Sequence, residues 1–206
     1  MIRKKVVRKA HAMRGELYRS LVLEAAEQEF AAHGFADARV QRVADSVGLS
    51  VGTLYNLFES KEGLYEELHK KRATALMEQL VASLNTDAPV QERLANTVRT
   101  LTAFAAEHPD YLRMVFQRGN AWSNQSSHSP VLEQRFFQRG VELASALCQL
   151  AISRGEMVED EPRRIVLTLM AVLQAQMASW LDSGLNEDAD AVSARIISLF
   201  SRMYAI

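Results

Sequence analysis

Apolar side chains recur three and four positions apart along almost the whole chain, which is the spacing that places them on one face of an α-helix. A segment near the amino terminus shows this clearly, with Tyr18, Val22, Ala26 and Phe30 at successive i+4 positions. Alternation with a period of two, the pattern of a half-buried β-strand, is nearly absent. With 48% hydrophobic residues among 206, the chain can bury a sizeable core. We therefore predict an all-α protein.

Glycine, serine and proline divide this periodic pattern into about nine helices. Gly34 is expected to end the first helix as a C-cap residue, and Ser60 is expected to cap a long fourth helix. Proline stands in the first turn of several later helices, where its missing amide hydrogen has no intrahelical partner to lose. The expected helices span approximately residues 15–33, 39–46, 50–57, 60–84, 89–107, 109–118, 130–154, 162–183 and 187–204.

Charge is distributed unevenly along the chain. Residues 1–72 carry a net charge of +3 and the remainder carries −4, which leaves −1 overall. The first 14 residues contain six lysines and arginines and no acid, so we interpret them as a basic arm. Such an arm follows the minor groove of DNA or adds attraction without sequence preference, unless it is a silent tail. A basic front on an acidic body suits a nucleic-acid-binding head joined to a regulatory body.

Cysteine use and apolar run length limit the class of protein further. Cys148 is the one cysteine, so an internal disulfide is excluded and a reducing, cytoplasmic location is expected. Cysteines and histidines show no metal-ligand spacing, and no cofactor motif occurs, so neither a metal nor a cofactor is expected. No apolar run approaches the roughly 18 residues that a membrane span needs, so no membrane partner is expected.

Residues 39–58, RVQRVADSVGLSVGTLYNLF, contain two short helical patterns joined by Val47-Gly48-Leu49. A connection this short makes a sharp helical corner, closed by apolar residues on both sides. The start of the second helix is left exposed, with short polar groups and one phenol that can approach base edges and phosphates of DNA. The residues of this exposed stretch are Ser50, Val51, Gly52, Thr53, Tyr55 and Asn56.

A longer pattern around this corner resembles the amino-terminal domain of the TetR family of transcriptional regulators. The resemblance covers roughly residues 16–68, and more than a dozen residues agree in type and spacing. They are Phe30, Gly34-Phe35, Val43-Ala44, Gly48-Leu49-Ser50, Gly52-Thr53-Leu54-Tyr55, Phe58 and Ser60-Lys61-Glu62.

The resemblance implies a three-helix helix-turn-helix domain over residues 15–68, after a basic arm over residues 1–14. It also implies that Tyr55 and Lys61 contact phosphates while Val51, Thr53 and Asn56 face the major groove. Two departures occur: the family often has threonines where this chain has Ala38 and Arg39, and histidine at Leu57. Asp37 is then the expected N-cap, and Arg39 either gains a phosphate contact or is simply solvated. The full expected DNA-binding set is Arg39, Gln41, Ser50, Val51, Gly52, Thr53, Tyr55, Asn56 and Lys61.

Residues 69–206 are expected to form a helical ligand-binding and dimerisation domain. By the resemblance, the last two helices pair across a twofold axis, because a homodimer matches a palindromic operator in double-stranded DNA. A mostly apolar cavity for a small effector is also implied, although each of its residues is alternatively plain core. The expected dimer residues are Leu169, Leu173, Trp180, Ile196, Leu199, Phe200 and Met203. The expected ligand residues are Phe104, Tyr111, Met114, Phe136, Cys148, Met170, Gln174 and Met177.

Other classes of protein remain as alternatives at this point. The nearest approach to a catalytic motif is Glu66-x-x-His69, the spacing of di-iron bundles, but those sites need two such motifs and this chain has one. We therefore interpret Glu66 and His69 as a solvated helix face and predict that the protein is not an enzyme. A DNA-coating protein or a regulator that responds to another protein would keep the head and lack the ligand cavity. The preferred function is a ligand-responsive repressor.

Overall fold

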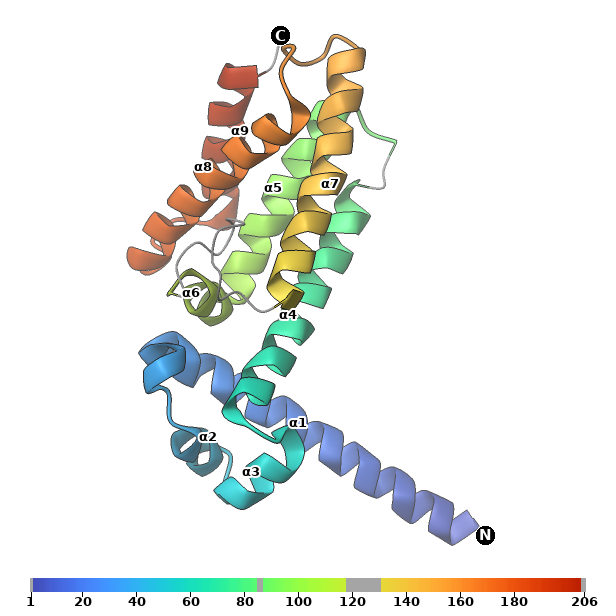
Figure 1. The fold of residues 1–206 in the computed structure, drawn as a ribbon, viewed down its shortest axis with the longest axis vertical. Helices are drawn as coiled ribbons and strands as arrows, with labels where there is room; N and C mark the ends of the chain where they lie inside the picture. The colour runs from blue at the N-terminus through green and yellow to red at the C-terminus, as the bar shows by residue number, and fades with distance from the viewer. Residues whose placement is uncertain (1, 85–86, 118–130, 205–206) are drawn as a thin grey trace. The chain divides into compact units, whose positions relative to one another are not determined.

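The computed structural model describes residues 2–84, 87–117 and 131–204, and this part of the chain is built from nine helices with no strand (Figure 1). The all-α prediction is confirmed, and eight of the nine helices begin and end within two residues of the predicted bounds. The helices are α1 Ile2–Asp37, α2 Val40–Ser46, α3 Val51–Phe58, α4 Lys61–Leu84, α5 Val90–Glu107, α6 Pro109–Gln117, α7 Val131–Ser153, α8 Pro162–Asp182 and α9 Ala189–Tyr204.

The first helix corrects the sequence analysis. It begins at Ile2, so the backbone of the expected arm is helical from there on and joins the predicted first helix without a break. The arm is rich in lysine, arginine and alanine, which favour helix. The sequence analysis interpreted these residues by their charge and did not consider their helix propensity. A helix is about 10–12 Å wide, whereas the minor groove is about 6 Å wide, so this segment does not follow that groove while helical. Gly34, with φ 71°, interrupts the helix near its end.

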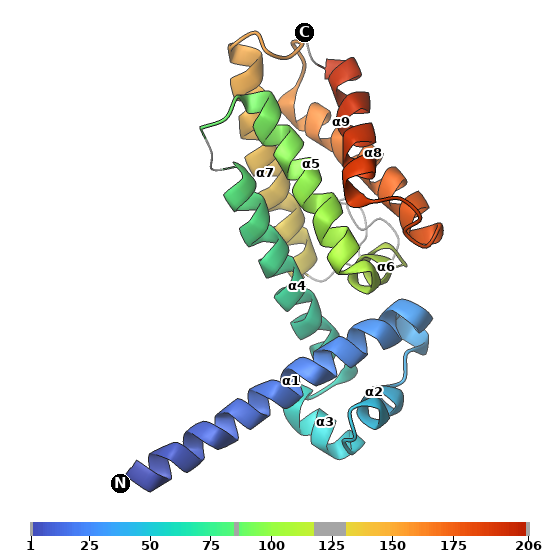
Figure 2. The same cartoon turned by 180° about the vertical axis from the view of Figure 1, so that it is seen from behind.

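The chain forms two compact units, residues 1–71 and 72–206, whose boundary falls inside α4. In the first unit, α2 and α3 pack beside the carboxy-terminal half of α1, and the amino-terminal half of α1 extends beyond them (Figures 1 and 2). Tyr65 stands at the centre of an aromatic group, with its ring centroid 5.3 Å from Phe30 and 5.2 Å from Phe35. The buried core of this unit includes Val22, Ala26, Phe30, Val43, Leu54, Phe58, Leu64, Tyr65 and Leu68.

The corner between α2 and α3 depends on Gly48. Its φ is 68°, a left-handed conformation that glycine adopts without a Cβ clash. The amide of Gly48 donates to the carbonyl of Asp45 at 3.2 Å, and the amide of Leu49 donates to Ala44 at 2.9 Å. These two bonds satisfy carbonyls that the end of α2 would leave open, so the chain turns directly into α3.

The second unit is arranged around α5, which contacts α6, α7, α8 and α9 (Figure 2). Val90 and Leu94 of α5 join Val141, Cys148 and other residues of α7 and α8 in a continuous core. Within the described residues, α8 alone is long and apolar enough to cross a membrane by length and composition. Its apolar residues, however, serve the core of this unit. The buried ones are Ile165, Val166, Leu169, Leu173, Met177, Trp180 and Leu181.

The first turn of α4 explains why glycine occupies position 63. The hydroxyl oxygen of Ser60 accepts a hydrogen bond from the amide of Gly63 at 2.9 Å, which confirms Ser60 as a cap. The turn passes so close to the end of α3 that a Cβ on Gly63 would lie 2.4 Å from the carbonyl oxygen of Phe58. A backbone atom cannot give way as a flexible side chain can, so only glycine fits.

We expect Gly63→Ala to lower the free energy of unfolding by about 1–3 kcal/mol, the cost of overpacking a closed site. Urea unfolding followed by circular dichroism measures it. Gly140→Ala is the matched control: it lies in α7 with open space where its Cβ would go, so it should be neutral or stabilise by up to about 1 kcal/mol. Equal stability of Gly63→Ala and the native chain would show that the first turn of α4 relaxes freely.

Candidate nucleic-acid interface

The helix α3 has one buried and one exposed face. Leu54 and Phe58 point into the core of the first unit. Gly52, Thr53 and Asn56 are exposed, and the side chain of Tyr55 is 39% exposed. The predicted polar stretch therefore lies together on the outer face of a short, anchored helix.

The hydroxyl group of Ser50 has a structural role within the protein. Its hydroxyl oxygen accepts the amide hydrogen of Thr53 at 3.1 Å and lies 2.8 Å from the hydroxyl of Thr53. Ser50 is thus the N-cap of α3, which satisfies one of the open amides at the helix start. Val51, the first residue of the helix, is half-buried. The cap fixes the first turn, and with it the direction in which Thr53 and Asn56 project.

Gly52 leaves bare backbone on this exposed turn. A Cβ built there would have one neighbour within 4 Å, the hydroxyl oxygen of Ser50 at 3.9 Å. The protein itself therefore has room for a side chain, although glycine inside a helix costs about 1 kcal/mol relative to alanine. The space that Gly52 leaves open is available to something outside the chain, such as a phosphate or a base edge.

The start of α2 is capped by a residue from α1. The amide of Arg39 donates to Oε1 of Glu29 at 2.8 Å, while the side chain of Arg39 makes no cap bond. Our expectation that Asp37 would be the N-cap was therefore wrong. Glu29 lies ten residues before Arg39, and sequence spacing within one helix end does not reach that far.

The same carboxylate holds a second arginine that sequence analysis missed. Arg42 lies one turn after Arg39 on α2, and its guanidinium is 3.4 Å from Oε1 of Glu29 and 2.8 Å from Nε2 of His33. Both arginines are exposed. The i, i+3 spacing of Arg39 and Arg42 was the signal for a shared basic face. Gln41, also exposed, donates to Asp45 of its own helix at 2.7 Å.

Lys61 is partly engaged within the protein. Its ammonium donates to the carbonyl of Ala36 at 3.0 Å and lies 5.0 Å from the ring centroid of Phe35. These contacts tie the start of α4 to the end of α1. A phosphate contact by Lys61 stays a prediction.

The interpretation of Glu66 and His69 as a solvated face was wrong for one of the two. Glu66 is exposed, but His69 is buried, and its ring stacks on Tyr65 with centroids 6.4 Å apart. A stripe of apolar residues with period four does not reveal that a neighbouring histidine is also turned inward.

The expected ligand residues lie in α5 to α8, in two groups. Phe104 and Tyr111 meet edge to face with ring centroids 6.1 Å apart, and Met114 and Met177 are buried as well. Cys148 belongs to the core that includes Leu94 and Ile165, with Met170 packed against it, and burial raises the pKa of its thiol to about 11. Phe136, Met170 and Gln174 are partly buried. An effector role for these eight residues stays a prediction.

A shallow pocket in the second unit lies apart from this set. It is enclosed by α5, the turn between α7 and α8, α8 and α9, and measures about 410 Å³ including space open to solvent. None of the eight expected ligand residues lines it, but Leu169 and Phe200 of the expected dimer set do.

The expected dimer residues divide by burial. Leu169, Leu173, Trp180 and Ile196 are at most 5% exposed within one protomer, so they have little surface to offer a partner. Leu199 and Phe200 are partly exposed, and Met203 is 48% exposed. Several of the predicted dimer residues therefore lie on the inner face of their helices. Apolar spacing in the sequence does not distinguish an intramolecular core from an interface between protomers. This restricts the set available to a partner to Leu199, Phe200 and Met203.

Comparison with known proteins places this geometry in a class. Residues 22–68 match the model of bacterial regulatory proteins of the tetR family. The HTH-type transcriptional repressor AcnR of Corynebacterium diphtheriae is 29% identical over 82% of this chain and 84% of its own length. The HTH-type regulator YdgC of Bacillus subtilis is 33% identical over 48% of this chain, which spans about half (52%) of that protein.

A solved structure shows the same fold over nearly the whole chain. The ketosteroid transcriptional regulator KstR2 of Mycobacterium tuberculosis superposes with a TM-score of 0.78 at 18% identity, covering 91% of this chain and 95% of that one. The fold and the anchored α3 define a helix-turn-helix, DNA-binding transcriptional regulator, and not an enzyme. Over residues 22–68 the chain is thus similar to the DNA-binding domain of the tetR family of bacterial regulatory proteins.

We expect Glu29→Ala to lower the free energy of unfolding by about 1–3 kcal/mol, because it leaves the Arg39 amide without its acceptor. Hydrogen exchange at the Arg39 and Val40 amides should also accelerate, since the start of α2 loses its cap. Glu24→Ala is the matched control on α1, because Glu24 is exposed and, among the described residues, its carboxylate accepts one hydrogen bond, from the Ser20 hydroxyl at 3.3 Å. If the exchange rate of the Arg39 amide is the same in Glu29→Ala as in the native chain, Glu29 does not cap α2.

Proposed function

We propose that this chain is a repressor that binds a palindromic operator as a homodimer, acts in the cytoplasm, and leaves the DNA when a small, largely apolar molecule binds. The observation that carries the proposal is the outer face of α3, where Thr53, Tyr55 and Asn56 are exposed together with the bare backbone of Gly52. Short polar side chains on a helix held firmly from behind suit the major groove.

Each exposed residue has a distinct part in this proposal. Asn56 offers the amide that pairs with two positions of adenine, and Thr53 offers a hydroxyl and a methyl to base edges. Tyr55 donates its phenol to a phosphate. Arg39 and Arg42 place two guanidinium groups on the neighbouring α2, and charge-assisted contacts with phosphates fix the register of α3 without carrying sequence information.

The homodimer is proposed to form through the exposed faces of α8 and α9. On α8, Leu167 is 38% exposed, and Ala171 and Ala175 follow at i+4 spacing and are exposed as well. On α9, Ala194 and Ser198 are exposed. Small side chains let two helix pairs approach closely. These exposed residues are proposed to form the dimer interface together with Leu199, Phe200 and Met203, the predicted dimer residues that are not buried within one protomer.

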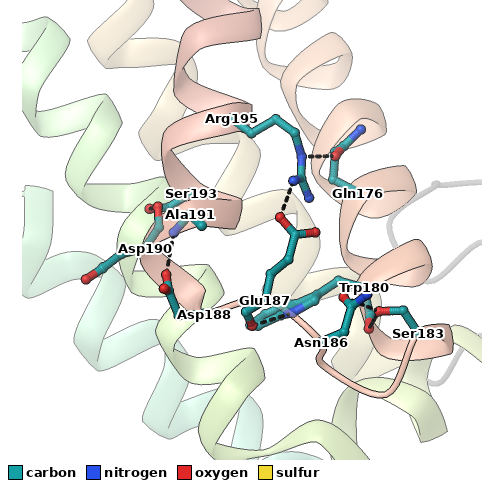
Figure 3. A network of polar contacts seen from close by, with 10 residues as sticks. All are labelled: Gln176, Trp180, Ser183, Asn186, Glu187, Asp188, Asp190, Ala191, Ser193 and Arg195. Atoms are coloured by element: carbon teal, nitrogen blue, oxygen red, sulfur yellow. Dashed lines mark hydrogen bonds and ion pairs between the residues drawn. The ribbon is translucent and has the colours of Figure 1, made fainter.

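Polar contacts hold this helix pair in a fixed geometry (Figure 3). Arg195 of α9 donates to Oε1 of Gln176 on α8 at 2.9 Å and to Oε2 of Glu187 in the connecting turn at 2.6 Å. The indole of Trp180 donates to the backbone carbonyl of Glu187 at 2.9 Å. A preformed helix pair loses little conformational freedom on dimerisation, which supports its use as the interface.

Release by a small molecule is proposed to act through α4. This helix begins at Lys61 in the DNA-binding unit and continues to Leu84 in the second unit. An effector among the residues of α5 to α8 must bind the released state more tightly than the DNA-bound state, and the operator then weakens effector binding by the same factor.

We expect Gly52→Ala to separate stability from DNA binding. The free energy of unfolding should rise by up to about 1 kcal/mol, because alanine favours helix and the Cβ meets no clash. Affinity for the operator, recovered by selection from random duplexes, should fall about tenfold or more, since the Cβ occupies the space left for DNA. Gly140→Ala should leave operator affinity unchanged. Selection that yields no palindrome, or full affinity in Gly52→Ala, contradicts the proposed role of α3.

We expect the native chain to be a dimer at micromolar concentration and Ala175→Glu to be monomeric, because a buried carboxylate without a partner is costly in an interface. Light scattering measures the mass of each. Val81→Glu is the control, since Val81 is an exposed apolar residue of α4, outside the proposed face. A native chain that is monomeric at this concentration would overturn the proposal.

A further inference from the structure

The carboxylate of Glu29 joins the end of α1 to the start of α2. Its side chain is only 9% exposed, and besides capping the Arg39 amide its Oε1 lies 3.4 Å from the guanidinium of Arg42. Its other oxygen, Oε2, lies 3.3 Å from Nδ1 of His33, one turn further along α1. The ring of His33 therefore contacts this carboxylate through one nitrogen and Arg42 through the other.

The two contacts of the His33 ring select one protonation state. The guanidinium of Arg42 is always charged and can only donate, so Nε2 of His33, 2.8 Å from it, is the acceptor and carries no proton. The proton of the neutral ring is then on Nδ1, which lies 3.2 Å from the backbone carbonyl of Glu29 and 3.3 Å from Oε2, both acceptors. The partners of both nitrogens therefore agree on a neutral ring with its proton on Nδ1.

A second proton on His33 would abolish the contact with Arg42. An imidazolium donates from both nitrogens, so Nε2 would no longer accept, and two cations would face each other. Among the described residues, the charged groups that contact the ring are Glu29 on its own helix and Arg42 on α2. Glu29 attracts the imidazolium and is nearly buried, whereas the side chain of Arg42 is 48% exposed and can turn away. Arg42 is therefore the group that moves.

We propose that neutral His33 is a positioning residue for Arg42, which holds the guanidinium ready for one operator phosphate until the ring takes up a proton. This role rests on the proposed function, in which Arg42 binds that phosphate. Both contacts of Arg42 with described residues use Nη1, so the N–H groups of Nε and Nη2 are left to pair with two phosphate oxygens. A long, exposed side chain that is already held at one nitrogen loses less conformational freedom when it binds DNA.

Protonation of His33 has two opposite effects on DNA binding. The added positive charge attracts any duplex, because attraction to phosphates does not depend on sequence. Release of Arg42 removes a contact that fixes the register of α3, which weakens binding to the operator more than binding to a random duplex. The quantity that separates the two effects is the operator preference, the dissociation constant for a random duplex divided by that for the operator. A merely structural role of His33 in α1 would not make this ratio depend on pH.

The test is titration of the full chain with its selected operator and with a random duplex of equal length, at constant ionic strength. It is done at about pH 8 and about pH 5.5, on either side of the range in which histidine ordinarily changes charge. We expect the operator preference of the native chain to fall about tenfold at the lower pH, through the loss of one charge-assisted hydrogen bond. His33→Gln, whose amide oxygen accepts from Arg42 and does not titrate, should match the native chain at the higher pH and keep its preference at the lower.

Two further variants and one spectroscopic measurement complete the test. His33→Ala removes the acceptor at every pH, so its operator preference should already be as low at the higher pH as that of the acidified native chain. His108→Gln is the matched control, because His108 lies in the second unit, and it should keep the pH dependence of the native chain. Nitrogen-15 NMR of the native chain at the higher pH should show the proton of His33 on Nδ1, a result that does not depend on DNA or on any variant.

Three results would each overturn the role of His33 while the proposed function stands. They are an operator preference of the native chain that is the same at both pH values, equal preferences of His33→Gln and His33→Ala at the higher pH, and a His33 proton on Nε2. If His33→Ala does not fold, the first and third results still decide. A native chain that selects no operator at the higher pH refutes the proposed function, and the role of His33 falls with it.

Discussion

The helix α3 depends on the burial of two of its eight residues. A helix this short is unstable alone in water, because helices below about 12–15 residues do not repay the cost of nucleation. Leu54 and Phe58, at most 3% exposed, fix it in the core of the first unit. The exposed residues of α3 take their position from these two side chains.

Phe58 also connects α3 to its neighbours. The guanidinium of Arg19 in α1 lies 4.8 Å from the centroid of the Phe58 ring and is paired with the carboxylate of Glu67 in α4. The hydrogen bonds that Arg19 donates to Glu67 raise the pKa of Arg19. One aromatic ring and one ion pair thus join three helices, and the narrow space left between α3 and α4 is the reason that Gly63 has no side chain.

Sequence patterns predicted the helices and the polar stretch of α3 because both are local properties. Gly34, Gly48 and Ser60 mark helix ends through their own backbone or hydroxyl groups, and these marks depend on few neighbours. Two kinds of feature were not accessible. The Glu29 cap of Arg39 joins residues ten positions apart, and the hydrogen bond from Gln91 to the carbonyl of Glu156 joins α5 to the turn between α7 and α8. Both depend on how helices pack.

The sequence also did not predict which apolar face of α8 and α9 is buried within the protomer and which is exposed. Ile196 and Leu199 are both apolar and lie in the same helix, yet one is fully buried and the other is partly exposed. Which apolar stripe of α9 faces inward depends on the position of α5, and α5 ends more than eighty residues before α9 begins. Apolar period alone therefore predicts that a helix is buried on some side without identifying that side.

The engagement of Lys61 inside the protein is compatible with a phosphate contact. An ammonium group has three hydrogen-bond donors, and the carbonyl of Ala36 takes one of them. The remaining two can reach a phosphate without breaking the tie between α1 and α4. A free lysine side chain would lose about 2 kcal/mol of conformational freedom when it is fixed on DNA, whereas Lys61 has already been restricted by Ala36 and the Phe35 ring. This restriction would lower the entropic cost of the proposed phosphate contact, so the structural role and the proposed DNA-binding role of Lys61 are compatible.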